Sequence, residues 1–194
     1  IISENPNSLF SIGLHPCFIN ENTANNLLEI EKLSTLPQVF AIGETGLDKR
    51  AKTSLEQQTE IFKAQIKIAN QVQKPIIIHC VKAFQEILSI KNEMKPGVPF
   101  IFHGFRGKPE LAKQLLKNNC FISVGKDAVY IPETIEIIPL DSLFLETDEK
   151  DFLIKDLYNG IALIKNISVE DLSKQIAINL EKVSHSESND KFNS

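Results

Sequence analysis

Four short apolar segments of this sequence each end on a side chain that can bind a metal ion. They read VFAIGE, PIIIH, PFIFH and LFLETD, and they end at Glu44, His79, His103 and Asp148. Two carboxylates and two imidazoles are a ligand set typical of divalent-metal sites that hydrolyse esters. Because helical patterns separate the segments, we interpret them as parallel strands that deliver the four residues to one face of the protein.

Each residue taken alone also has a simpler explanation. A single histidine that ends an apolar strand is more often a core residue, Glu44 could be an exposed loop carboxylate, and Asp148 could cap a turn. Two histidines in equivalent positions make coincidence less convincing, and Gly43 and Gly46 around Glu44 permit the close backbone approach that a site loop needs. The neighbouring acid of the last segment, Glu146, is expected to be out of phase with the strand and to point elsewhere.

Other polar residues are candidates for the pocket wall. His15 in GLHP either lines the pocket or is a loop histidine fixed by Pro16. Arg106 and Lys126 are candidate anion binders, and their alternative role is that of solvated loop charges. Lys82 is a further possible pocket-lining residue. A dyad between His79 and the adjacent Cys80 is not expected, because neighbouring residues on a strand point to opposite faces.

Strand-like and helical patterns alternate along the whole chain. The helix over 54–72 has the clearest start, because Ser54 and Gln57 occupy the positions of a capping box. We expect strands at 9–13, 38–42, 76–78, 100–102, 120–124 and 142–145, and helices at 22–33, 54–72, 83–94, 109–116, 131–138, 151–164 and 168–183.

Continuous apolar strands followed by helices indicate an α/β fold with a parallel sheet. The two candidate architectures are a doubly wound sheet and a TIM-barrel-like (β/α) barrel, and the absence of glycine-rich phosphate loops disfavours nucleotide-binding doubly wound folds. A closed barrel typically needs about 250 residues, so the chain is short of one by about one or two strand–helix units. The sequence predicts one domain over residues 1–183 and a polar tail over 184–194, which includes His185.

Composition restricts the setting of the protein. The formal net charge is −4 and no run of Lys or Arg exceeds two residues, so a basic stripe for nucleic acid is not evident. No apolar segment approaches the roughly 20 residues that span a bilayer, so no membrane contact is expected. Three cysteines without a CxxC pair argue against a disulfide framework and favour a reducing, cytoplasmic location.

An ordered set of motifs resembles the TatD family of metal-dependent hydrolases. The set comprises SIGLHP, AIGETGLD, QQTEIFKAQIKIA, KPIIIHCVKAF, FHGFRG, FISVG, LFLETD and IAINLEKV, and it covers nearly the whole chain. The resemblance implies a TIM-barrel-like fold and phosphodiester hydrolysis, with DNA as the usual substrate class. It also implies that Glu44 is a bridging carboxylate and that His79 and His103 bind one metal. Asp148 would bind the other metal and accept a proton from the attacking water, so Glu44 and Asp148 are the implied catalytic residues.

Several positions depart from the family pattern. The HxH pair that completes the second metal site is not found, and because the chain starts at Ile1 we expect that an N-terminal segment precedes it. The resemblance thus implies a TIM-barrel-like fold that lacks its N-terminal strand or strands in this sequence. If no segment precedes Ile1, the barrel is open and one metal site is impaired. HCVK and HGFRG replace the more usual IHSR and HCFSG patterns, which affects the expected substrate choice more than metal binding.

The intact protein is expected to hold two divalent ions, with Mg²⁺, Mn²⁺, Zn²⁺ and Co²⁺ as candidates. The expected partner is nucleic acid or a small phosphodiester. Two alternatives remain open at this stage. One is an amidohydrolase-like enzyme that cleaves a small amide or ester, and the other is a catalytically impaired barrel that acts as a binding protein.

Overall fold

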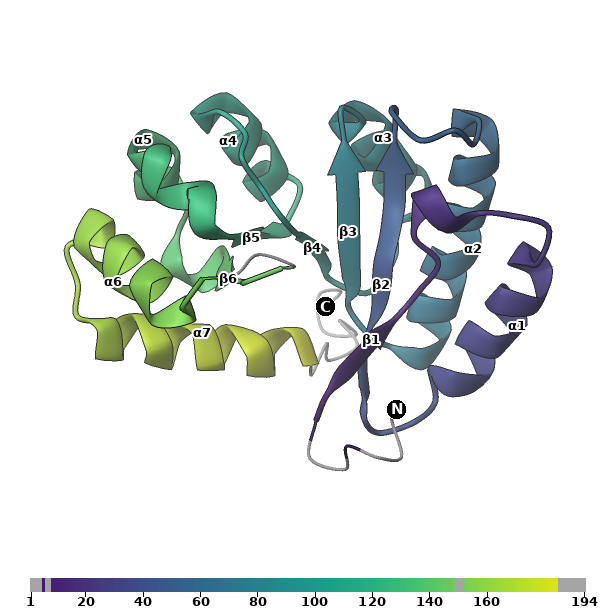
Figure 1. Cartoon of the computed structure of the whole chain (residues 1–194), viewed down its shortest axis with the longest axis horizontal. Helices are drawn as coiled ribbons and strands as arrows, with labels where there is room; N and C mark the ends of the chain where they lie inside the picture. Colours follow the sequence, from purple (N-terminus) through teal and green to yellow (C-terminus); the bar gives the residue numbers. More distant parts are fainter. Residues whose placement is uncertain (1–4, 6–7, 149–151, 185–194) are drawn as a thin grey trace, which may run out of the picture.

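The computed structural model describes residues 5, 8–148 and 152–184, in which strands and helices alternate (Figure 1). The strands are β1 Phe10–Ile12, β2 Val39–Asp48, β3 Ile76–Val81, β4 Phe100–Phe102, β5 Cys120–Val124 and β6 Leu143–Leu145. The α-helices are α1 Thr23–Leu33, α2 Leu55–Val72, α3 Phe84–Met94, α4 Pro109–Lys117, α5 Pro132–Ile137, α6 Ile154–Lys165 and α7 Val169–Ser184. Short 3₁₀ turns are η2 Pro16–Phe18, η3 Lys126–Tyr130 and η4 Leu140–Ser142.

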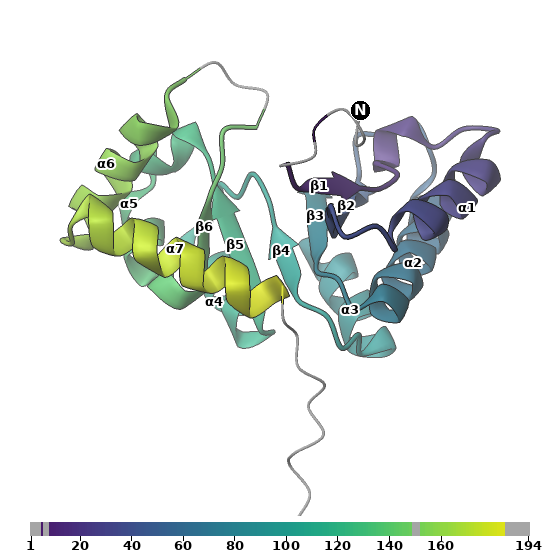
Figure 2. The same ribbon diagram turned by 90° about the horizontal axis from the view of Figure 1, so that it is seen from below.

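The six strands form one parallel sheet in the order β1-β2-β3-β4-β5-β6. The sheet is curled into a half-barrel, with most of the helices on its outer side (Figure 2). A TIM-barrel-like fold is thereby confirmed over a doubly wound sheet, since the strand order follows the chain without reversal. The carboxyl ends of all six strands meet at one edge, where parallel barrels carry their functional residues.

Alternate residues of β2, β4, β5 and β6 enter two different cores. Ile76 and Ile78 of β3 pack in the large core between sheet and helices, together with residues of the helices such as Phe62 of α2. A smaller core fills the concave side and contains Phe40, Ile101, Phe121, Phe144 and, from α7, Val183. This alternation determines which strand residues face the inside of the half-barrel.

Most expected elements occur within a few residues of their predicted bounds, and one strand differs substantially. The strand expected to end at Ile42 continues as β2 to Asp48, because the polar sequence GETGLD still pairs with β3. The polar tail from residue 185 and the expected start of a helix at Asp151 lie outside the described residues. None of the helices in the described ranges combines the length and apolar character needed to span a bilayer.

Candidate metal centre

Glu44 reaches the concave face through an irregularity in β2. Ile42 pairs with Ile76 of β3, and Thr45 pairs with Ile78, so β2 uses three residues where β3 uses two. Such a bulge re-aims one side chain and is frequent near functional sites. Glu44 therefore lies inside β2 and does not end a strand, which corrects the prediction of a strand end at this residue.

Two glycines make this backbone path possible. Gly43 has φ +153°, and a Cβ on it would lie 2.6 Å from the carbonyl oxygen of Ile77. Gly46 has φ +145°, and a Cβ there would overlap the carbonyl oxygen of His79. Both positions therefore require glycine, because any other side chain would collide with the neighbouring strand and strain the backbone.

His79 and His103 converge on the carboxylate of Glu44. His103 Nε2 lies 3.0 Å and His79 Nδ1 lies 3.7 Å from Glu44 Oε2. The same two ring nitrogens are 3.4 Å apart. His79 lies within β3, which continues to Val81, whereas His103 directly follows β4. The sequence thus brings three of its four predicted ligands to one point, although only His103 lies just beyond the end of its strand.

A second carboxylate stands behind each of these histidines. Asp48 Oδ2 is 3.2 Å from His79 Nε2, and Glu146 Oε1 is 3.5 Å from His103 Nδ1. Each acid thus accepts a hydrogen bond from the far ring nitrogen, so the nitrogen that faces Glu44 can give up its own proton and offer a lone pair to a metal ion. This is the arrangement that orients histidine ligands toward a metal ion.

The position of Glu146 corrects the expectation that it points elsewhere. Phe144 of β6 faces the concave core, so the side chain two residues later faces the same side. Glu146 also accepts hydrogen bonds from the Gly104 N–H at 2.7 Å and from the Ser123 hydroxyl. Neither Glu146 nor Asp48 was predicted as a site residue. Asp48 could have been suspected from its place in AIGETGLD, and Glu146 from a correct count of strand phase.

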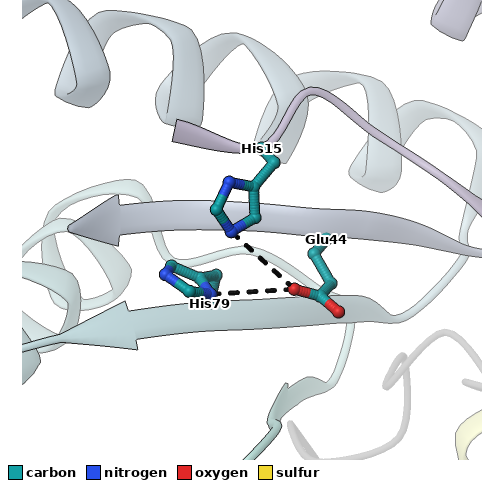
Figure 3. A group of neighbouring side chains, drawn as sticks. All are labelled: His15, Glu44 and His79. Carbon is teal, nitrogen blue, oxygen red and sulfur yellow. Dashed lines mark ion pairs between the residues drawn. The ribbon is translucent and has the colours of Figure 1, made fainter. Parts of the chain in front are cut away.

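His15 lies beside the two other histidines but has different hydrogen-bond chemistry. In the described part of the chain, ligand atoms of His15, Glu44 and His79 all lie within 4.8 Å of one another (Figure 3). However, His15 Nδ1 accepts the backbone N–H of Cys17 at 3.1 Å, so the neutral ring carries its proton on Nε2. That nitrogen lies 3.9 Å from Glu44 Oε2. With its Nδ1 lone pair used by Cys17 and its proton on Nε2, His15 is better suited to donate a hydrogen bond to an anion than to bind a metal ion.

Opposite charges compensate one another in the centre. Hydrogen bonds from His103 and His79 hold the pKa of Glu44 far below its usual range. Burial alone would lower the pKa of His103, but its hydrogen bonds to Glu146 and Glu44 outweigh burial and raise the pKa to about 10. Burial and the nearby His79 lower the pKa of His15, which keeps that ring neutral. The protonated ring of His103 thus lies between the carboxylates of Glu44 and Glu146, which together favour a cation at this position.

Two buried glutamines of α2 hold the backbone around the centre. Gln65 accepts the N–H of Leu14 at 2.7 Å and donates to the carbonyl of Leu14 at 3.0 Å and to the Thr45 hydroxyl at 2.6 Å. Gln58 accepts the N–H of Asp48 at 2.8 Å and donates to its carbonyl at 3.0 Å. These bonds fix the segments that carry His15 and Asp48, which explains why a long amphipathic helix buries polar side chains.

A cavity of about 460 Å³ adjoins the centre and carries cationic side chains. His79, His103 and Asp148 line it together with Arg50, Lys82 and Arg106. Asp148 is exposed at its rim with φ +52° and does not belong to the three-residue group around Glu44. Lys126 lines a separate small pocket beside Asp148, and Arg106 forms an ion pair with Asp127 at 3.1 Å. Arg50 was not predicted from the sequence.

The donor set fits a divalent cation. Two imidazole nitrogens and a carboxylate oxygen converge, and the carboxylates behind both rings leave those nitrogens free to act as ligands. Mixed nitrogen and oxygen ligands of this kind accept several first-row metals as well as Zn²⁺.

Comparison with known proteins identifies the family to which this chain belongs. The family model for TatD-related DNases matches residues 1–185. The uncharacterized metal-dependent hydrolase YabD of Bacillus subtilis is 38% identical over 145 residues, which cover 71% of this chain and 57% of that protein. The 3'-5' ssDNA/RNA exonuclease TatD of Erwinia tasmaniensis is 28% identical over 88% of this chain and 76% of its own length.

A solved structure shows the same fold. The TatD homologue YJJV of Escherichia coli superimposes with a TM-score of 0.81 at 20% identity, over 94% of this chain and 79% of that one. At that identity the likeness concerns the fold alone, and the family assignment depends on the sequence match over residues 1–185. The chain spans little more than half of the Bacillus relative, and it belongs to the TatD-related DNase family of metal-dependent hydrolases.

Proposed function

We propose that this chain carries the metal centre of a phosphodiesterase that cleaves nucleic acid, with DNA as the expected substrate. The main support is the convergence of His79 Nδ1 and His103 Nε2 on Glu44, each ring held by a carboxylate on its far side. The exonuclease name of one relative and the cations of the adjoining cavity point to the same substrate class.

Glu44, His79 and His103 would hold one divalent ion, and Glu44 with Asp148 would contribute to a second. A bound divalent ion acts as a Lewis acid that activates water near neutral pH and offsets the charge of a phosphate. Asp148, at the cavity rim, would accept the proton that the attacking water loses. His15 would donate a hydrogen bond from its Nε2–H to a non-bridging phosphate oxygen.

The cationic side chains of the cavity would position the substrate. Arg50, Lys82 and Arg106 all line it, and in the described part of the chain the Arg50 guanidinium makes only a long ion pair, with Nε 3.8 Å from Asp48 Oδ1. Exposed cations beside a metal centre attract phosphates despite the net charge of −4, because the local potential decides the approach of a substrate. Arg106, in place of the more usual serine, would then influence which phosphodiester is accepted.

We also infer one functional domain over residues 1–183 and a reducing, cytoplasmic setting. The free state of Cys17, Cys80 and Cys120 in the structure supports the second inference. Cys80 packs among apolar residues on the helix side of the sheet, where burial raises its pKa to about 12. A thiol with this pKa is a poor nucleophile near neutral pH, so Cys80 is assigned no catalytic role although it also lines the metal-site cavity.

The test combines metal binding with hydrolysis. Mn²⁺, Co²⁺ or Zn²⁺ should bind the wild-type chain, and with metal it should cleave bis-p-nitrophenyl phosphate or single-stranded DNA. Glu44→Ala should abolish both properties. Asp148→Asn should abolish cleavage while the site of His79 and His103 still binds metal, and Glu181→Ala on α7 is the matched control.

Three results would contradict the proposal. Cleavage that survives in Glu44→Ala would show that the reaction does not depend on this centre. Hydrolysis of small amides without phosphodiester cleavage would favour an amidohydrolase. Absence of stoichiometric metal binding would favour a binding protein.

A further inference from the structure

A second cavity of about 550 Å³ adjoins the metal-site cavity. The two share Arg106 and Gly107, so a chain-like ligand could occupy both. We call the second cavity the Tyr130 pocket; Lys108, Glu110, Tyr130 and Glu133 also line it. Its volume is within the range of sites that bind a nucleoside-sized ligand, about 300–1,000 Å³.

The pocket is built from loops at the functional edge of the sheet. Tyr130 ends η3, which begins directly after Gly125 at the carboxyl end of β5. Lys108 precedes α4, in the segment that follows His103. Both loops thus leave the edge that carries the metal centre, and α4 and α5 lie side by side behind them (Figure 1).

Tyr130 is exposed but its backbone is anchored. Its side chain is 76% exposed, whereas Ala128 two residues earlier is buried. Val129 packs so closely on α6 that a Cβ at Gly160 would lie 2.7 Å from its Cγ1. The N–H of Ile131 bonds to the carbonyl of Ala128 at 3.1 Å. A ring that is held at its base and free on its face is suited to stacking, because binding does not have to order the loop.

The charges of the pocket favour a base over a phosphate. Arg106 and Lys108 are balanced by Glu110 and Glu133, so these four side chains sum to no net charge. A phosphate clamp would need an excess of cations. A nucleobase is uncharged and offers a π face to tyrosine. In cytosine, adenine and guanine it also has an exocyclic amine that can donate a hydrogen bond to a carboxylate.

We propose that the Tyr130 pocket binds the base of a nucleotide next to the cleaved phosphodiester of a single-stranded nucleic acid. The base stacks on the ring of Tyr130. Its exocyclic amine donates a hydrogen bond to the carboxylate of Glu110 or Glu133, and Arg106 contacts the phosphate that passes between the two cavities. This inference rests on the proposed function, because it assumes that the neighbouring centre acts on nucleic acid.

The binding test needs neither metal nor turnover. An oligonucleotide that carries 2-aminopurine is titrated in EDTA, and quenching of its fluorescence reports stacking. Stacking on an aromatic side chain contributes about 1–3 kcal/mol per base, so Tyr130→Ala should weaken binding about 5- to 150-fold. Tyr130→Phe should retain most of the affinity. Leu28→Ala on α1, an exposed apolar residue of 65% exposure, is the matched control and should leave binding unchanged.

A second measurement separates the failure of this inference from that of the proposed function. With metal, Tyr130→Ala should lower kcat/KM for the oligonucleotide by a larger factor than kcat/KM for bis-p-nitrophenyl phosphate, which has no nucleobase, whereas Leu28→Ala should leave both values unchanged. Equal oligonucleotide binding by wild type and Tyr130→Ala, or no quenching with wild type, would overturn the base site. If wild type binds and quenches the oligonucleotide through Tyr130 but hydrolyses neither substrate, the base site stands and the proposed catalytic function is wrong.

Discussion

Replacing Asp48 with asparagine should weaken metal binding without removing any predicted metal ligand. Asp48 Oδ1 accepts the backbone N–H of Arg50 at 2.7 Å, while Oδ2 lies 3.2 Å from His79 Nε2. In Asp48→Asn the amide oxygen should stay on that N–H, because an NH₂ group there would face another donor. The NH₂ group would then point at His79 Nε2 and force its proton onto Nδ1, the nitrogen that faces Glu44 and His103.

The expected magnitude follows from the role of a carboxylate behind a ligating histidine. Loss of such a partner typically lowers metal affinity 10- to 100-fold, or about 1.4–2.7 kcal/mol of binding free energy. The Asp48 side chain is only 9% exposed, so water is poorly placed to replace the carboxylate. We therefore expect an effect toward the upper end of that range. Its physical origin is the tautomer of His79.

Calorimetric titration of the metal-free protein with Zn²⁺ or Mn²⁺ would measure the affinity. Long-range ¹H–¹⁵N correlation spectra of the imidazole would report which nitrogen of His79 carries the proton. Asp141→Asn, an exposed aspartate in η4 that precedes β6 and so lies toward the amino end of the strands, is the matched control. Unchanged metal affinity in Asp48→Asn, with the His79 proton moved to Nδ1, would refute the assignment of Nδ1 as the ligand atom.

Three further predictions concern stability. Gln65→Leu should lower the free energy of unfolding by about 3 kcal/mol or more in urea denaturation, because it leaves the buried N–H and carbonyl of Leu14 without partners. Gly46→Ala should destabilise the chain by at least about 1–3 kcal/mol from backbone strain alone, whereas Gly97→Ala, whose Cβ would lie 3.4 Å from Asn70 Oδ1, should change stability by about 1 kcal/mol or less. In EDTA, the free energy of unfolding should fall as pH rises from about 6.5 to about 10, because the raised pKa of His103 stabilises the fold only while that ring is protonated. In His103→Gln this fall should be shallower.

Each of these results has a contrary outcome. A Gln65→Leu protein as stable as wild type would mean that water or a shifted backbone satisfies Leu14. Equal stability of Gly46→Ala and Gly97→Ala would show that β2 can move away from His79. An equal pH dependence of wild type and His103→Gln would assign the titration to other groups.

Several features of the fold were predictable because they depend on local patterns. Apolar β-branched runs predicted five of the strands closely, and Ser54 with Gln57 predicted the start of α2, where the Gln57 N–H bonds to the Ser54 hydroxyl at 3.3 Å. Ser168 similarly accepts the N–H of Asp171 at 3.0 Å at the start of α7. The continuation of β2 to Asp48 was not predictable from apolar patterning, since its residues pair with β3 through the backbone while their side chains are polar.

The residue types and their order were sufficient to indicate a metal site with Glu44, His79 and His103, because parallel strands bring their carboxyl ends to a common edge. Only the tertiary structure decided how those residues are held. The phase of a side chain depends on bulges and register, so the inward aim of Glu44, which follows from the bulge in β2, could not be read from spacing. Likewise, the pairing of Asp48 with His79, and hence the nitrogen left to face a metal, depends on contacts between residues far apart in the chain.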